Sequence, residues 1–139
     1  MSNVYYNRQS VNKNDIKLVS KALTQNLITT GNFVKKFEKK ISNLLKCKYT
    51  VSCSSGTAAL HLALMSINLK RGDVIIMPAI NFIASYNICR IARAKVFLTD
   101  VDPISGQMTP DTIKQCIKKN NLKKIKAIIT MYLGGFPEN

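Results

Sequence analysis

The sequence has no tryptophan, one histidine, and only seven acidic residues against 21 basic ones in a chain of 139 residues. No apolar stretch approaches the ~18 residues that a membrane-spanning helix needs, and the first ten residues lack the apolar core of a signal peptide. The four cysteines form no CxxC pair and have no neighbouring histidine, so neither a zinc site nor a disulfide framework is indicated. We therefore expect a soluble, cytoplasmic protein with reduced thiols and no metal site.

The net charge of +14 points first to a nucleic-acid surface. Lysine supplies 17 of the basic residues, however, and no aromatic residues alternate with the basic runs to stack on bases. Residues 35–40 carry four lysines opposite an apolar stripe whose three-and-four spacing predicts one buried helix face. That stripe consists of Val34, Phe37, Ile41, Leu44 and Leu45. We interpret the lysines as a solvated face and expect neither a nucleic-acid nor a membrane partner.

The 46% apolar content suffices for a folded core, and the length fits one domain. A helical segment over about residues 1–46 precedes alternating strands and helices over about residues 47–139. We expect helices at 14–25, 57–67, 82–92 and 110–119, a further helix that ends near Lys46, and strands at 49–52, 74–77, 95–99 and 126–130. Strands separated by helical crossovers predict an α/β fold, a partial three-layer sandwich with a mostly parallel sheet covered on both faces.

The junction after the first expected strand is a run of small residues from Ser52 to Leu60. At a helix N-terminus the backbone N–H groups are unpaired, and Gly56 allows an anion to approach closely, so this junction predicts a phosphate cradle. The segment matches neither a Walker loop nor the GxGxxG fingerprint. The alternative is an ordinary helix capped by Ser55 or Thr57, and the spacing alone leaves both interpretations open.

Two further junctions carry candidate side chains. Phe82 follows a buried strand through Pro78, where its ring is able either to stack on a planar heterocycle or to pack in the core. Asp100 and Asp102 follow the next strand, where they bind a metal or cap a turn. Turn chemistry is the favoured interpretation for the two aspartates.

A series of short motifs, in this order and spacing, resembles the DegT/DnrJ/StrS family over about residues 10–139. Each motif is weak alone, but the succession is specific. The motifs are Thr29-Thr-Gly31, Phe37-Glu38, Ser55-Gly-Thr-Ala-Ala-Leu-His-Leu-Ala-Leu64, Gly72-Asp73, Pro78-Ala-Ile-Asn-Phe-Ile-Ala-Ser85, Asn87 and Val101-Asp102. That family comprises fold-type-I enzymes that use pyridoxal 5'-phosphate, mostly transaminases acting on nucleotide-linked keto sugars. The resemblance implies that this chain is the N-terminal part of such an enzyme's large domain.

The resemblance also assigns roles to individual residues. It places Gly56, Thr57 and Ala58 at the cofactor phosphate, stacks Phe82 on the pyridine ring, and puts the loop of Thr29, Thr30 and Gly31 near the sugar. The implied reaction transfers an amino group, commonly from glutamate, to a nucleotide-linked keto sugar. Surface polysaccharide or amino-sugar biosynthesis is the implied context, and a homodimer is the implied assembly of the full-length enzyme.

Two departures from the family pattern qualify this expectation. The family's Schiff-base lysine and the aspartate that pairs with the pyridine nitrogen belong to segments beyond Asn139. We therefore predict no catalytic residue in this chain, no activity of the chain by itself, and a fragment of a longer enzyme. Many relatives have histidine where Tyr132 stands.

Two alternatives to the aminotransferase remain open. One is a dehydratase of the same family, which uses the pyridoxamine form of the cofactor and has histidine in place of the lysine. The other is a non-catalytic Rossmann-like nucleotide-binding domain.

Overall fold

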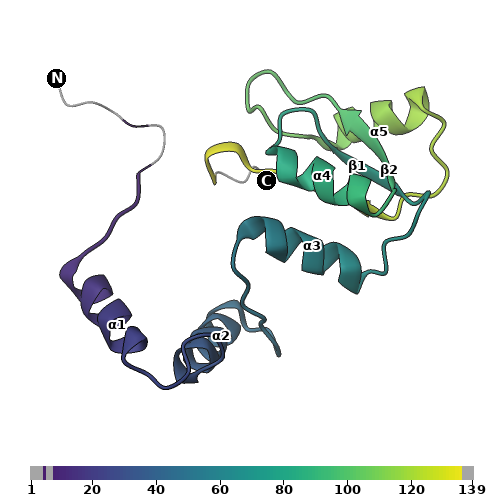
Figure 1. Ribbon diagram of the computed structural model, residues 1–139. Helices are drawn as coiled ribbons and strands as arrows, with labels where there is room; N and C mark the ends of the chain where they lie inside the picture. Colours follow the sequence, from purple (N-terminus) through teal and green to yellow (C-terminus); the bar gives the residue numbers. More distant parts are fainter. Residues whose placement is uncertain (1–4, 6–7, 136–139) are drawn as a thin grey trace. The chain divides into compact units, whose positions relative to one another are not determined.

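The computed structural model describes residue 5 and residues 8–135, so the predictions that extend to residues 1 and 139 include positions outside the described part. The chain divides into two compact units, Met1–Ser52 and Cys53–Asn139, and each is described by itself. Figure 1 shows the helices of the first unit and the sheet of the second. No helix among the described residues is long and apolar enough to span a membrane.

The first unit contains two helices near the predicted positions. α1 spans Lys13–Leu23, and α2 spans Asn32–Leu45. The start of α1 is set by a reciprocal cap: the Asn12 side chain accepts a hydrogen bond from the Asp15 amide (3.2 Å), and the Asp15 carboxylate accepts one from the Asn12 amide (2.8 Å). Such a capping box satisfies two backbone donors that the helix itself leaves unpaired.

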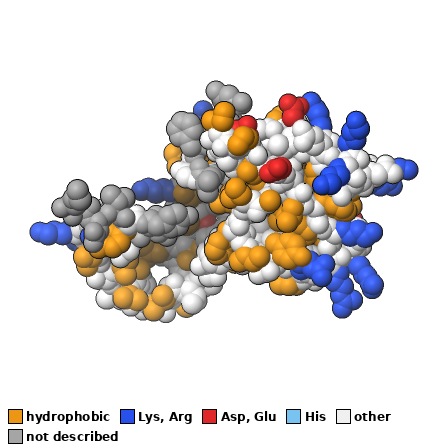
Figure 2. All heavy atoms as spheres, turned by 90° about the horizontal axis from the view of Figure 1, so that it is seen from above, with side chains coloured by type: hydrophobic (Ala, Val, Ile, Leu, Met, Phe, Trp, Pro, Cys, Tyr) orange, Lys and Arg blue, Asp and Glu red, His pale blue; other side chains and the backbone are white. Residues whose placement is uncertain are grey.

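The prediction that the apolar stripe of α2 is buried is wrong. No residue of this helix is buried, and Phe37, Leu44 and Leu45 are 55%, 76% and 66% exposed. The lysines on the opposite side are exposed, as predicted. Because the described part of this unit has no sheet, the stripe lacks the second layer against which such faces normally pack. Other hydrophobic side chains are also visible on the molecular surface (Figure 2).

The strand expected at residues 49–52 does not form. The Ser52 amide, which would have joined a sheet, instead donates to the Glu38 carboxylate at 2.8 Å, and the Ser52 hydroxyl donates to the same oxygen at 2.9 Å. The turn after α2 is tied by a backbone bond from the Cys47 amide to the Ser42 carbonyl (3.0 Å). The Glu38 carboxylate therefore accepts the Ser52 amide, which in a sheet would donate to a neighbouring strand.

The second unit is built on a parallel sheet in the order β2-β1-β3. The strands are β1 (Val74–Pro78), β2 (Lys95–Thr99) and β3 (Ala127–Ile128), and β3 is shorter than predicted. Val74 pairs with Lys95, and Ile75 pairs with Val96 on one side and Ala127 on the other. β1 is thus the central strand among the described residues.

Three helices cover this sheet, namely α3 (Gly56–Ser66), α4 (Ile83–Ile91) and α5 (Pro110–Lys119). The chain moves from β1 to β2 through α4, then returns across β1 to β3 through α5. Because parallel crossovers are right-handed, these opposite movements place α4 and α5 on opposite faces of the sheet (Figure 1). The predicted α/β fold with a covered parallel sheet is confirmed.

The core lies between β1 and the pair α3 and α4. Ile75 and Met77 of β1 are at most 1% exposed and pack with Leu64 of α3 and with Ile88 and Cys89 of α4. Burial raises the pKa of the Cys89 thiol, because a thiolate is poorly solvated there. The side chain therefore behaves as a small apolar residue.

The hydrogen bonds between Glu38 and Ser52, which hold the end of the first unit, are predicted to weaken at acidic pH. The Ser52 amide, and next its hydroxyl, lower the pKa of the Glu38 carboxyl, which outweighs a smaller opposing effect of burial. A group whose pKa is lower in the folded state stabilises that state above its unfolded pKa, and the contribution is lost as the pH falls through the folded pKa. In an NMR titration, the Ser52 amide signal of the wild type is expected to move with the protonation of Glu38.

The Glu38→Gln variant provides the control, because its side chain has no carboxyl proton to gain. The Ser52 signal of this variant is expected to stay constant over the same acidic range. An identical titration of Ser52 in both proteins would show that another group, not Glu38, binds this amide.

Candidate functional site

The candidate site lies at the end of the sheet where β1 and β2 finish. α3 precedes β1 and α4 follows it, and both helices run antiparallel to that strand, so their N-termini meet its carboxyl end (Figure 1). Ligands of open α/β sheets bind at this end. The four candidate cofactor residues all belong to these two helix starts: Gly56, Thr57, Ala58 and Phe82.

The start of α3 combines a cap with two open donors. The Ser55 hydroxyl accepts the Ala58 amide at 3.1 Å, and the Ser55 carbonyl accepts the Ala59 amide at 3.0 Å. The amides of Gly56 and Thr57 have no acceptor among the described residues. The capped helix of the second interpretation is therefore observed, and the same helix start presents the two N–H groups and the positive dipole end that a phosphate cradle would need.

Gly56 faces open space. A Cβ atom built on it would meet nothing within 4 Å. Packing inside the chain therefore does not require glycine at this position.

Phe82 stands directly before α4 and is 68% exposed, so it does not pack in the core. Its ring borders a largely apolar cavity of about 220 Å³ at the ends of β1 and β2, which Pro78, Tyr86 and Leu98 also line. Gly56, Thr57 and Ala58 do not line this cavity. The structure thus places the ring and the open amides at the same end of the sheet but not in one cavity.

Asn81 is a site residue that the sequence did not single out. It lines the same cavity as Phe82, and its Nδ2 atom is buried without a hydrogen-bond partner among the described residues. A buried amide donor without an acceptor costs free energy unless a ligand or water pairs with it. The sequence feature that could have indicated Asn81 is its position as a polar residue soon after the apolar strand that ends at Pro78.

Of the two aspartates after β2, Asp102 acts as a turn residue, as predicted, whereas the Asp100 carboxylate accepts the amide of its neighbour Val101, at 2.9 Å. One oxygen of Asp102 accepts the amides of Ile104 (3.0 Å) and Ser105 (2.8 Å) and the Ser105 hydroxyl (3.1 Å). The hydrogen bonds from Ser105 hold the pKa of the Asp102 carboxyl below its usual value. Among the described residues there is no group of three side chains suited to hold a metal ion.

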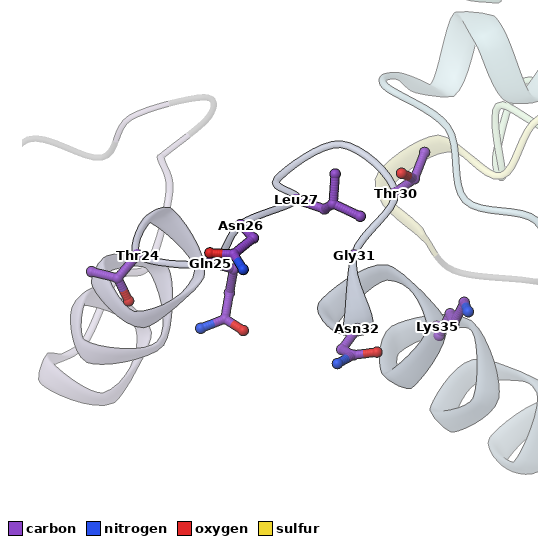
Figure 3. A pocket seen from close by; sticks show the side chains of 8 residues that line it. All are labelled: Thr24, Gln25, Asn26, Leu27, Thr30, Gly31, Asn32 and Lys35. Carbon is purple, nitrogen blue, oxygen red and sulfur yellow. The ribbon is translucent and has the colours of Figure 1, made fainter.

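The predicted sugar loop belongs to the first unit. Thr30 and Gly31 border a polar hollow of about 330 Å³, whereas Thr29 does not (Figure 3). Lys35, on the first turn of α2, lines the same hollow. Gly31 is required by packing, because a Cβ atom there would collide with the carbonyl oxygen of Leu27.

Tyr132 precedes a short 3-10 helix at Leu133–Gly135, and its carbonyl accepts the Gly135 amide at 2.9 Å. Its side chain is 49% exposed. Gly134 and Gly135 both have positive φ values, of 69° and 74°, which glycine adopts at little cost.

Comparisons with known proteins identify relatives of this chain. Residues 9–139 match the DegT/DnrJ/EryC1/StrS aminotransferase family. Over 107 residues the chain is 36% identical to GDP-perosamine synthase of Escherichia coli O157:H7, which covers 77% of this chain and 28% of that enzyme. An aminotransferase from Psychrobacter cryohalolentis superposes with a TM-score of 0.80 at 30% identity, covering 92% of this chain and 32% of that one.

A second solved structure is the E. coli GDP-4-keto-6-deoxy-D-mannose-3-dehydratase with bound hydrated pyridoxal phosphate. It superposes with a TM-score of 0.78 at 25% identity, covering 88% of this chain and 32% of that one. This chain spans about a third of the length of these relatives. The likeness to enzymes of this family confirms the predicted fold-type-I architecture and pyridoxal phosphate as the cofactor of the family.

The close approach at Gly31 predicts that Gly31→Ala destabilises the start of α2. The added Cβ would force apart the backbone at Leu27, and overpacking of this kind costs about 1–3 kcal/mol. Urea unfolding followed by circular dichroism measures the change. Gly56→Ala is the matched control, because the same substitution there meets open space. Equal midpoints for the two variants would contradict the packing role of Gly31.

Proposed function

The chain belongs to the DegT/DnrJ/EryC1/StrS aminotransferase family, and we propose that it is the N-terminal part of the large domain of a sugar aminotransferase. In this proposal it forms the phosphate-binding and ring-stacking side of the pyridoxal phosphate site. One observation carries it: two open amides begin α3 at the same end of the sheet as the exposed ring of Phe82.

The residues fit the cofactor by their chemistry. The N–H groups of Gly56 and Thr57 donate to the phosphate, and the dipole of α3 favours its negative charge. Ala58 contributes through the cap that shapes this turn, because its own amide is bound to Ser55. Phe82 offers an apolar face to the planar heterocycle and keeps water from that side.

Asn81 adds a donor with no acceptor in the described part of the chain, suited to an acceptor atom of the cofactor or substrate. When bound, the cofactor supplies the electron sink for bond changes at the amino-bearing carbon. The contribution of this chain is to bind, orient and shield.

The substrate proposal rests on the 36% identity to a GDP-perosamine synthase. A nucleotide-linked keto sugar receives the amino group, with glutamate as donor, in surface polysaccharide or amino-sugar biosynthesis. The polar hollow at Thr30, Gly31 and Lys35 offers hydroxyl, amide and ammonium donors to the sugar nucleotide. Thr29 stands next to it in the same loop. Assembly as a homodimer in the cytoplasm belongs to this proposal.

A dehydratase is the second candidate, because the E. coli dehydratase covers 88% of this chain at 25% identity. The amides, the aromatic ring and the sugar loop serve both reactions equally. The aminotransferase is preferred because the similarity to the perosamine synthase is higher, at 36% identity.

The phosphate role of α3 predicts the effect of Gly56→Pro. Proline is well tolerated at the first position of a helix, and Ser55, with φ −162° and ψ 162°, already has the extended conformation that a residue before proline needs. The substitution therefore removes one N–H donor and keeps the helix. Losing a charge-assisted hydrogen bond should weaken pyridoxal phosphate binding about tenfold in an absorbance titration.

The control for this experiment is Gly56→Ala, which keeps the amide and adds only a methyl group. We expect its affinity for pyridoxal phosphate to fall less than that of Gly56→Pro, because the amide donor is kept and the methyl group meets no atom of this chain. An equal loss in both variants would show that bulk at residue 56, not its amide, controls binding.

The chain by itself is predicted to bind the cofactor without covalent attachment and to show no turnover. All 17 lysines are exposed, so none occupies the apolar surroundings that activate a catalytic lysine. Borohydride reduction with pyridoxal phosphate, followed by peptide mapping, should label lysines slowly and non-selectively. One lysine labelled stoichiometrically, with turnover of glutamate and a keto sugar nucleotide, would overturn this prediction.

A further inference from the structure

A second hollow lies at the amino-terminal end of the sheet, opposite the candidate cofactor site. Its volume is about 1060 Å³, and its wall includes the first residues of β1 and β2 and the segment between α5 and β3. Four lysines line it, namely Lys95, Lys123, Lys124 and Lys126. Neither the fold core nor the proposed reaction uses these residues.

Backbone hydrogen bonds of the sheet fix two of these lysines in place. The Lys95 amide donates to the Asp73 carbonyl and the Lys126 amide to the Val74 carbonyl, both at 2.8 Å. Lys95 in β2 and Lys126, directly before β3, therefore flank Val74, with their Cα atoms about 10 Å apart, twice the spacing of strands. Their side chains leave the sheet on the same face, because Lys95 is paired with Val74 and Lys126 lies beside it.

The charge of the hollow is strongly positive. Asp73 is the one carboxylate among its lining residues, and that carboxylate already accepts the Lys70 amide at 2.9 Å. Lys123, Lys124 and Lys126 follow one another closely along a single segment. Figure 2 shows Lys and Arg side chains crowding the right-hand end of the view.

The backbone of Arg93 lies next to the wall of the hollow, because its carbonyl accepts the amide of Gly72, a lining residue, at 3.0 Å. Arg93 has a φ of 56°, the left-handed conformation with which α4 ends. Its side chain is not part of the lining.

We propose that this basic hollow binds an oligophosphate, a compact molecule with two or more adjacent phosphate groups, at a site separate from the cofactor phosphate site. Lysine ammonium groups bind phosphates as point charges, and four of them, from β2 and from the segment before β3, line the hollow and would surround a multiply charged anion. A concave wall suits a compact anion better than a flat bilayer. Phe97 is the aromatic residue of the wall, and it is half-buried. It therefore offers little exposed ring surface on which the bases of a nucleic-acid strand could stack.

Isothermal titration with inorganic triphosphate tests the proposal in buffer of about 0.15 M ionic strength, where exposed charges are largely screened from each other. Two triple variants with the same net charge are compared with the wild type. The site variant is Lys95→Gln, Lys124→Gln and Lys126→Gln, and the control variant is Lys36→Gln, Lys39→Gln and Lys40→Gln on the exposed face of α2. The site variant should lose about tenfold in affinity or more, and the control variant less than about twofold.

Equal losses in the two variants would overturn the proposal, because net charge alone would then explain binding. Tighter binding of an RNA oligonucleotide or of acidic phospholipid vesicles than of triphosphate would also overturn it, in favour of a polymer or membrane surface. If the site variant fails to fold, NMR of the wild type locates the binding site instead. Triphosphate should then shift the amide signals of residues 93–95 and 120–126. Shifts centred on α2 or on α3 would contradict the proposed site.

The same titration separates this site from the cofactor site. Gly56→Pro should leave triphosphate binding unchanged, and saturating pyridoxal phosphate should not displace triphosphate from the wild type. Competition between the two ligands would show one shared phosphate site and overturn the inference, whatever the outcome for the aminotransferase.

Discussion

The parallel pairing of β1 with a strand on each side is the interaction on which the second unit depends. Ile75, Ile76 and Met77 are almost fully buried, so this strand carries the core on both faces of the sheet. A strand buried in this way needs every backbone group paired, and β2 and β3 supply those partners. Its direction then sets the direction of α3 and α4, which pack antiparallel to it.

Because the strands are parallel, the two ends of the sheet present different groups to a ligand. The carboxyl end receives the helix N-termini, where the open amides of Gly56 and Thr57 form a donor site made of backbone. The amino end receives the helix C-termini and the strand starts, where lysines of β2 and of the segment before β3 line one hollow. One end is therefore suited to a phosphate held by backbone N–H groups, and the other to phosphates held by side-chain ammonium groups.

The first unit is organised by local contacts. A capping box starts α1, a glycine under the Leu27 carbonyl shapes the entry to α2, and Glu38 holds Ser52. Its apolar side chains are exposed rather than packed, since its described part is two helices without a sheet. The proposed sugar loop thus stands on a unit whose order comes from hydrogen bonds more than from a core.

The sequence by itself determined the features that follow from local pattern. Alternating periodicity predicted the α/β fold, β2 and α5 have the predicted bounds, and Asp102 after β2 forms the predicted turn. The succession of short motifs identified the family. These features depend on neighbours within a few residues, or on an order of motifs that is visible in the chain.

Only the tertiary structure decided which groups are paired and which are open. Residues 49–52 form no strand, and the amide of Ser52 is bound to Glu38 of a helix instead. The stripe of α2 is exposed because the described part of its own unit contains no sheet that would cover it. Asn81 is buried without a partner and Lys95 faces a basic hollow because of what other segments bring beside them. Pairing and burial are relations between distant residues, so a linear pattern does not contain them.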